Sequence, residues 1–215
     1  PGSLSLTRRS ARQLLADRPG GGRLDLVAAE AGALPLADRC ADRVLLLDVV
    51  EHLHDWQLRE LLAEIRRIIR PSGYVVLHTL PNRWALGIAY PLLRLLVPSL
   101  PREARSDYER AVHVNEQSPR SLRRALQDAG FESRVWVEEW TTRHARRGAG
   151  RAYPDRARRR AYGALDRPMF RMGSRWLMRS PARNLVGNDI FALARPIDGR
   201  AEPGLPSRGR YRALG

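Results

Sequence analysis

The sequence has no lysine and only one cysteine, and both shortages limit what the protein can be. All 38 basic residues among the 215 are arginines, a bias that a GC-rich genome can produce without selection for guanidinium chemistry. The single Cys40 excludes an internal disulfide and favours a reducing compartment. The first residues do not combine a charged segment with an apolar run, so no signal peptide is expected. We therefore expect a cytoplasmic protein.

Acidic residues are scarce in one part of the chain, although the whole chain is basic with a formal net charge of +15. Thirteen arginines lie between residues 141 and 183, against Asp155 and Asp166. Such a basic insert, taken as residues 141–186, can meet nucleic acid, anionic lipid or an acidic substrate. A solvated surface is the leading interpretation, because the arginine content is general. Nucleic acid is accordingly disfavoured as a partner, although RNA binding through this insert stays open as an alternative.

Short apolar segments alternate with helical patterns along the chain. The predicted strands are residues 24–29, 43–47, 74–79, 131–140 and 188–194, and the predicted helices are residues 4–18, 56–70 and 118–130. The unbroken apolar run at 44–47 predicts a strand buried on both faces. Alternation of this kind predicts a mostly parallel sheet covered by helices, with ligands beyond the carboxyl ends of the strands. Loops leave those ends at Glu30, Asp48, Leu80 and Trp140.

Four fragments of the sequence resemble the class I S-adenosylmethionine-dependent methyltransferases, in particular those that modify small molecules, quinones and lipids. The fragments are "AEAGALPLADRCADRVLLLDVVEHLHD", "LLAEIRRIIRPSGYVVLHTLPNRW", "HVNEQSPRSLRRALQDAGF" and "NDIFALARP", and they occur in the family's order. The resemblance implies a Rossmann-like α/β sheet, mostly parallel with an antiparallel last strand, and S-adenosylmethionine as cofactor. It implies that Glu30 and Ala31 lie beside the adenine, and that Leu47, Asp48 and Val49 line the methionine half.

The sequence departs from the family at its beginning. The family's first strand with its glycine-rich loop, and the acid that holds the ribose hydroxyls, have no counterpart here. In the family's sheet the two missing strands separate the segment 24–29 from the segment 43–47. The expected fold is therefore N-terminally incomplete, and we expect this chain to bind the cofactor weakly. A non-catalytic remnant is an alternative to a truncated enzyme.

Two histidines are candidates for catalysis. Methyl transfer from a sulfonium mainly requires alignment, but an oxygen or carbon nucleophile also benefits from a nearby base. His52, one turn beyond the cofactor rim, is the first candidate and His113 is the second; for each, a purely structural role is at least as good an interpretation. His52 and His54 are two positions apart, which is wrong for a pair of metal ligands on a helix, so no metal is predicted.

The remaining segments suggest an acceptor class. Residues 84–100 are apolar but interrupted by Pro91, Arg94 and Pro98, and they are too short for a membrane span of ~20 residues. They predict a lid over a hydrophobic acceptor or an interfacial helix, within a lid-like insert at 80–112. The expected domain covers residues 1–196, with a disordered tail at 197–215. We expect O- or C-methylation of a small or lipid-like acceptor, with contact to a membrane surface; the oligomeric state stays open.

Overall fold

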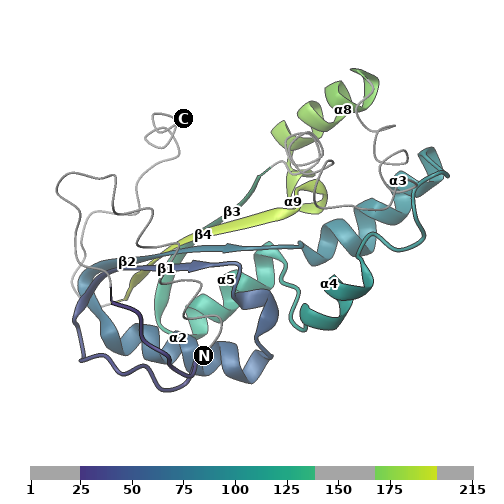
Figure 1. The fold of residues 1–215 in the computed structure, drawn as a ribbon. Helices are drawn as coiled ribbons and strands as arrows, with labels where there is room; N and C mark the ends of the chain where they lie inside the picture. Colours follow the sequence, from purple (N-terminus) through teal and green to yellow (C-terminus); the bar gives the residue numbers. More distant parts are fainter. Residues whose placement is uncertain (1–24, 139–167, 198–215) are drawn as a thin grey trace, which may run out of the picture.

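Four strands form one mixed sheet in a computed structural model that describes residues 25–138 and 168–197. The order across the sheet is β1 (Ala41–Leu47), β2 (Ile69–Thr79), β4 (Asp189–Pro196) and β3 (Phe131–Glu138). β1 and β2 are parallel, whereas β4 is antiparallel to both of its neighbours. Three strands therefore share one direction and only the last in sequence is reversed (Figure 1), which confirms the expected fold class.

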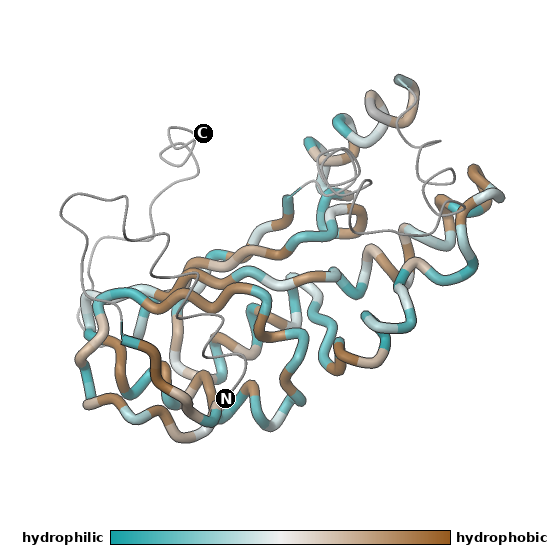
Figure 2. Tube along the Cα trace, viewed as in Figure 1, coloured by the Kyte–Doolittle hydropathy of each residue, from teal (hydrophilic) through white to brown (hydrophobic). Residues whose placement is uncertain are grey.

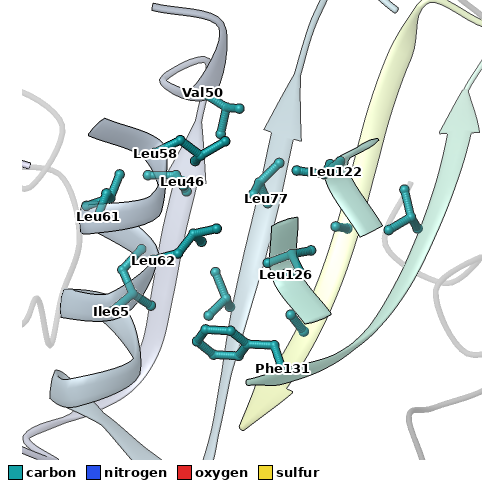
Figure 3. Packing of buried hydrophobic residues seen from close by; sticks show 14 of the residues in the cluster. Leu46, Val50, Leu58, Leu61, Leu62, Ile65, Leu77, Leu122, Leu126 and Phe131 are labelled. Carbon is teal, nitrogen blue, oxygen red and sulfur yellow. The ribbon is translucent and has the colours of Figure 1, made fainter. Parts of the chain in front are cut away.

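Two helices cover one face of this sheet. α2 (Asp55–Ile68) and α5 (Pro119–Asp128) lie on the same side in Figure 1. In α2 the buried residues recur every three or four positions, so one stripe of the helix faces the sheet. These residues are Leu58, Leu61, Leu62, Ile65 and Ile68. Figure 3 shows Leu62 and Ile65 of α2 together with Leu77 of β2, Leu126 of α5 and Phe131 of β3 in the resulting core.

The sequence correctly predicted how α5 begins and ends. The Ser118 side chain accepts a hydrogen bond from the backbone N–H of Ser121 at 3.1 Å, and Pro119 occupies the first turn, where its missing N–H is harmless. Gly130 follows the helix with a φ of 79°, a left-handed conformation that glycine adopts without strain. Both ends of the helix are therefore fixed. The cap at Ser118 also fixes the point where the preceding loop, with His113 and Asn115, joins the helix.

The prediction that residues 44–47 are buried on both faces was wrong. Leu46 is only 7% exposed, whereas Leu45 and Leu47 on the opposite face are 65% and 52% exposed. Successive side chains of a strand point to opposite faces, and α2 and α5 both pack on the face that Leu46 shares. Within residues 25–138 and 168–197, the second face of β1 is left open to solvent.

The predicted strand at 24–29 does not form in the part that the structure describes. Residues 25–29 have no strand conformation, and Glu30 makes only an isolated bridge with Ala33. A strand needs a neighbour to satisfy its backbone hydrogen bonds, and none of the four described strands pairs with residues 25–29. The residues that follow this segment pack on α2, where the Leu34 N–H donates to the Glu64 carboxylate at 2.8 Å.

The lid-like insert at 80–112 is largely helical. It contains a π-helical turn η2 (Ala85–Ala89), α3 (Tyr90–Leu96) and α4 (Asp107–Val112). Of the basic insert, α8 (Pro168–Arg179) and α9 (Arg183–Val186) are described. The predicted helix at 4–18, the middle of the basic insert and the tail from residue 198 lie outside the described residues. None of the described helices is both long enough and apolar enough to cross a bilayer.

Candidate active site

The candidate site lies where β1 and β2 end. Asp48 follows β1 with a φ of 54°, which turns the chain sharply out of the sheet. Its backbone N–H donates to the carbonyl of His78 at 3.1 Å, and its carboxylate accepts a hydrogen bond from His78 Nδ1 at 2.6 Å. Two contacts to one residue of β2 fix this turn. The short 3-10 helix η1 (Val50–His52) then begins at the rim of the sheet.

Glu51 is the buried centre of the site. Its side chain is almost fully enclosed, and one carboxylate oxygen accepts a hydrogen bond from the Thr79 hydroxyl at 2.7 Å. Its backbone carbonyl accepts from the N–H of Asn115 at 3.1 Å. A carboxyl group without such partners would be costly to bury. Glu51 therefore ties together the ends of β1 and β2 and the loop that precedes α5.

The two candidate histidines meet although they are far apart in sequence. The ring centroids of His52 and His113 are 5.0 Å apart in an edge-to-face arrangement with an interplanar angle of 64°. His52 Nδ1 lies 3.0 Å from the backbone carbonyl of Val112, an acceptor, so Nδ1 carries the proton and Nε2 has the free lone pair. His113 caps the C-terminus of α4, where its N–H donates to the carbonyl of Glu109 at 2.9 Å. A free Nε2 on His52 is the atom that a base requires.

Sequence reasoning missed Glu51, Thr79 and Asn115. Glu51 carried one signal, since it follows the apolar pair Val49-Val50 just beyond the predicted strand at 43–47. No sequence signal pairs it with Thr79, which belongs to the next strand. Asn115 is also buried, and its side-chain oxygen accepts a hydrogen bond from Gln117 at 2.5 Å. Glu51 connects these residues, because it accepts hydrogen bonds from the Thr79 hydroxyl and the Asn115 N–H and lies close to both histidines.

The residues expected to hold the cofactor lie on an open part of the molecule. Glu30 is exposed, and Ala31 is half-buried against the core. Asp48 is 57% exposed and Leu47 is similarly open, whereas Val49 packs partly into the core. The structure thus places Asp48 at the predicted strand end, beside η1. It holds Glu30 in a separate loop, so the roles of these residues toward a cofactor stay predictions.

The loop that follows Glu30 is anchored by charge. Arg67 donates to the carboxylates of Glu64 and Asp38 and to the carbonyls of Leu34 and Leu36. The hydrogen bond from Arg67, as the largest cause, and that from the Leu34 N–H, as the second, lower the pKa of Glu64 to about 2. The same carboxylates, Glu64 first, raise the pKa of Arg67 above its usual range. This network stabilises the loop from Leu34 to Asp38 against α2.

The start of the lid-like insert is held firmly. The Asn82 side chain is fully buried and donates to the carbonyls of Asn184 and Gly187 at 2.8 and 2.7 Å. Its oxygen accepts from the N–H of Trp84 at 3.1 Å. The insert is therefore joined to α9 near its first residue, and α3 extends outward from a fixed base.

Comparison with known proteins identifies the family of this sheet and rim. The methyltransferase-domain family matches residues 15–134, which is more than half of the chain. The chain belongs to the methyltransferase-domain family. Among curated proteins, none matches it.

Solved structures give the same fold for this methyltransferase domain. It is similar to the YcgJ protein from Bacillus subtilis (14% identity, TM-score 0.51), with 91% of this chain and 79% of that one covered. It is also similar to geranyl diphosphate C-methyltransferase from Streptomyces coelicolor (14% identity, TM-score 0.50), with 91% of this chain and 62% of that one covered. A SAM-dependent methyltransferase from Archaeoglobus fulgidus matches at 20% identity and a TM-score of 0.44, with 74% and 61% covered. The chain thus spans about three fifths of the length of several neighbours.

Proposed function

We propose that this methyltransferase domain transfers the methyl group of S-adenosylmethionine to an oxygen or carbon of a small, lipid-like acceptor. The observation that carries the proposal is the meeting of His52 and His113 at the carboxyl end of β1, adjacent to Leu47, Asp48 and Val49. In sheets of this class, ligands bind outside those strand ends. The histidines thus stand where an acceptor would face a cofactor lying along the rim.

The reaction needs one bond made and one broken. The acceptor oxygen or carbon forms a bond to the methyl carbon, the carbon–sulfur bond breaks, and its electron pair stays on sulfur, which loses its positive charge. The acceptor's proton passes to a base, and His52 Nε2 has the free lone pair for it. Glu51 holds the position of His52, since its buried carboxylate and backbone fix η1 to β2 and to the loop before α5.

Exposed apolar residues on two helices support a hydrophobic acceptor. Leu92, Leu95 and Leu96 lie on one side of α3, at i, i+3 and i+4 spacing, and are 58–77% exposed. Phe170 of α8 packs into the same small cluster as Leu93 of α3, so the two helices are neighbours. Figure 2 shows the apolar part of α3 at the end of the molecule far from α2. A patch of this kind on a soluble surface is typical of a site for a lipid, a membrane or a partner.

α8 contributes a second apolar stripe to the same end. Met169, Met172 and Trp176 are about 70% exposed and recur at helical spacing. Arg175 and Arg179 on the same helix bring positive charge close to this stripe. Apolar side chains next to arginines fit an acceptor with a hydrocarbon tail and an anionic head group. Together with α3 they favour a lipid-like acceptor over RNA, for which the described residues offer no comparable feature.

The test separates cofactor binding from catalysis. Isothermal titration is expected to give weak S-adenosylmethionine binding, because the sequence has no glycine-rich loop between a strand and a helix; tight binding would contradict that expectation. Transfer of a labelled methyl group to quinone and lipid acceptors is then measured at high cofactor concentration. His52→Ala is expected to lower turnover ~100-fold or more. His54→Ala, the matched control two residues away, is expected to keep it. Equal turnover of the two variants excludes His52 as the base.

A further inference from the structure

We propose that Glu51, His52 and His113 form a binding site for one divalent transition-metal ion. Each of these residues offers one ligand atom, and the three atoms lie within 4.8 Å of one another. Two imidazoles and one carboxylate are a common donor set for Zn²⁺ and for related ions such as Fe²⁺ and Co²⁺. The sequence analysis missed this set because it sought a partner for His52 at helical spacing, whereas the second histidine comes from the end of α4.

The geometry is close to that of a bound ion. Ligand atoms about 2.1 Å from a zinc ion lie at most ~4.2 Å apart. The three ligand atoms lie within 4.8 Å of one another, so any excess over that limit is at most ~0.6 Å, which small side-chain rotations can close. The residues are also held in place, because Glu51 is fixed by Thr79 and His113 ends a helix. The set needs little rearrangement to receive a cation.

The surroundings orient each ligand. His52 Nδ1 donates to the carbonyl of Val112, which leaves Nε2 for coordination; metal-bound histidines usually have such a second partner. Glu51 uses one oxygen for the Thr79 hydroxyl, which is a typical outer contact of a ligating carboxylate. His113 Nδ1 is enclosed, and within the described residues it has no hydrogen-bond partner. Coordination through Nδ1 would supply the partner that this nitrogen otherwise lacks.

The class of ligand follows from charge and coordination number. One carboxylate and two neutral imidazoles leave a divalent ion with one net positive charge. Three protein ligands also leave a position open for an outside oxygen. An acceptor hydroxyl or enol bound there would have a lowered pKa, and the ion would position the resulting oxygen anion for methyl transfer. This catalytic role of the ion rests on the proposed function. In it, His52 is a metal ligand, and the ion activates the acceptor in place of a free His52 base. Binding of the ion does not depend on the proposed function.

The experiment measures metal binding directly. Tag-free protein is treated with a chelator, dialysed and titrated with Zn²⁺ by calorimetry, with Co²⁺ by visible absorption and with Mg²⁺ as the hard-cation comparison. We expect one Zn²⁺ or Co²⁺ per chain, weaker Mg²⁺ binding and a Zn²⁺-dependent rise in melting temperature. His113→Ala and the near-isosteric Glu51→Gln should each weaken Zn²⁺ binding ~10-fold or more. His54→Ala removes a histidine outside the cluster and should not.

The result that overturns the proposal is a wild-type titration without a stoichiometric Zn²⁺ or Co²⁺ site, or an affinity that His113→Ala and Glu51→Gln leave unchanged. Melting curves of the metal-free variants show whether each one folds, so a folding defect is not mistaken for a lost ligand. Methyl transfer is assayed separately with and without Zn²⁺. Metal binding without methyl transfer would leave the metal site and contradict the proposed function. Methyl transfer without metal binding would support the proposed function and contradict the metal site.

Discussion

The two faces of β1 differ sharply, although the same run of apolar residues supplies both. On one face, Leu46 is buried beneath α2 in the core shown in Figure 3, whereas Leu45 and Leu47 on the other face are mostly exposed. Burial of a leucine contributes about 1.5–3 kcal/mol when it is complete and little when it is not. Within the described residues, the packing that stabilises β1 is therefore on the core face, and the other face contributes little.

The candidate site also has a well-packed part and a part that is open to solvent. Glu51, His52 and His113 are connected to β2, α4 and the loop before α5. Asp48 and Leu47, which the family resemblance assigns to the cofactor, lie at the open edge of the sheet. In the described residues, the histidine side of the rim is thus well packed, while the side that the family resemblance assigns to the cofactor is open to solvent. Substitutions of packed residues are therefore expected to lower stability more than substitutions of residues on the open side.

The largest expected effect comes from the packed face. Leu46→Ala removes a buried side chain and leaves a cavity against α2, so we expect the free energy of unfolding to fall by about 2–5 kcal/mol. Urea unfolding measures it as a lower midpoint at unchanged slope. A loss below ~1 kcal/mol would mean that the packing around this residue is looser than the structure describes.

An intermediate effect, dependent on pH, is expected at the loop that packs on α2. Glu64 has a pKa of about 2 in the folded protein against 4.5 ordinarily, because Arg67 and the Leu34 N–H bind its charged form. A lowered pKa contributes stability above pH ~4.5 that is lost as the pH falls toward 2. Glu64→Gln should lower the melting temperature at pH 7 by less than Leu46→Ala does. The difference from the wild type should shrink as the pH falls through this window; a difference independent of pH would exclude the charge as its cause.

The smallest effect is expected on the open face. Leu45→Ala makes the same chemical change as Leu46→Ala on the neighbouring residue, but its side chain is 65% exposed. We expect a change within about 0.5 kcal/mol, because exposed side chains contribute little to packing. The same urea titration measures it. A loss as large as that of Leu46→Ala would show that this face is covered in solution, and the contrast between the two faces would disappear.

Local patterns predicted the packed side well. The apolar spacing in α2, the cap at Ser118, the stop at Gly130 and the reversed last strand all agree with the structure, since each depends on residues close in sequence or on a well-defined fold class. The strand at 24–29 failed for the opposite reason. Its apolar composition fits a strand, but a strand is stable only beside another one, and composition does not say whether that neighbour exists.

The sequence by itself determined the fold class, the family resemblance and the two histidines worth attention. Only the tertiary structure decided that His52 and His113 meet, and that Glu51 lies close to both and accepts a hydrogen bond from Thr79. The physical reason is the architecture of the sheet. Parallel strands bring their carboxyl ends, and the loops that follow, to one edge. Residues separated by most of a domain in sequence become neighbours there, and no helical or strand period relates their positions.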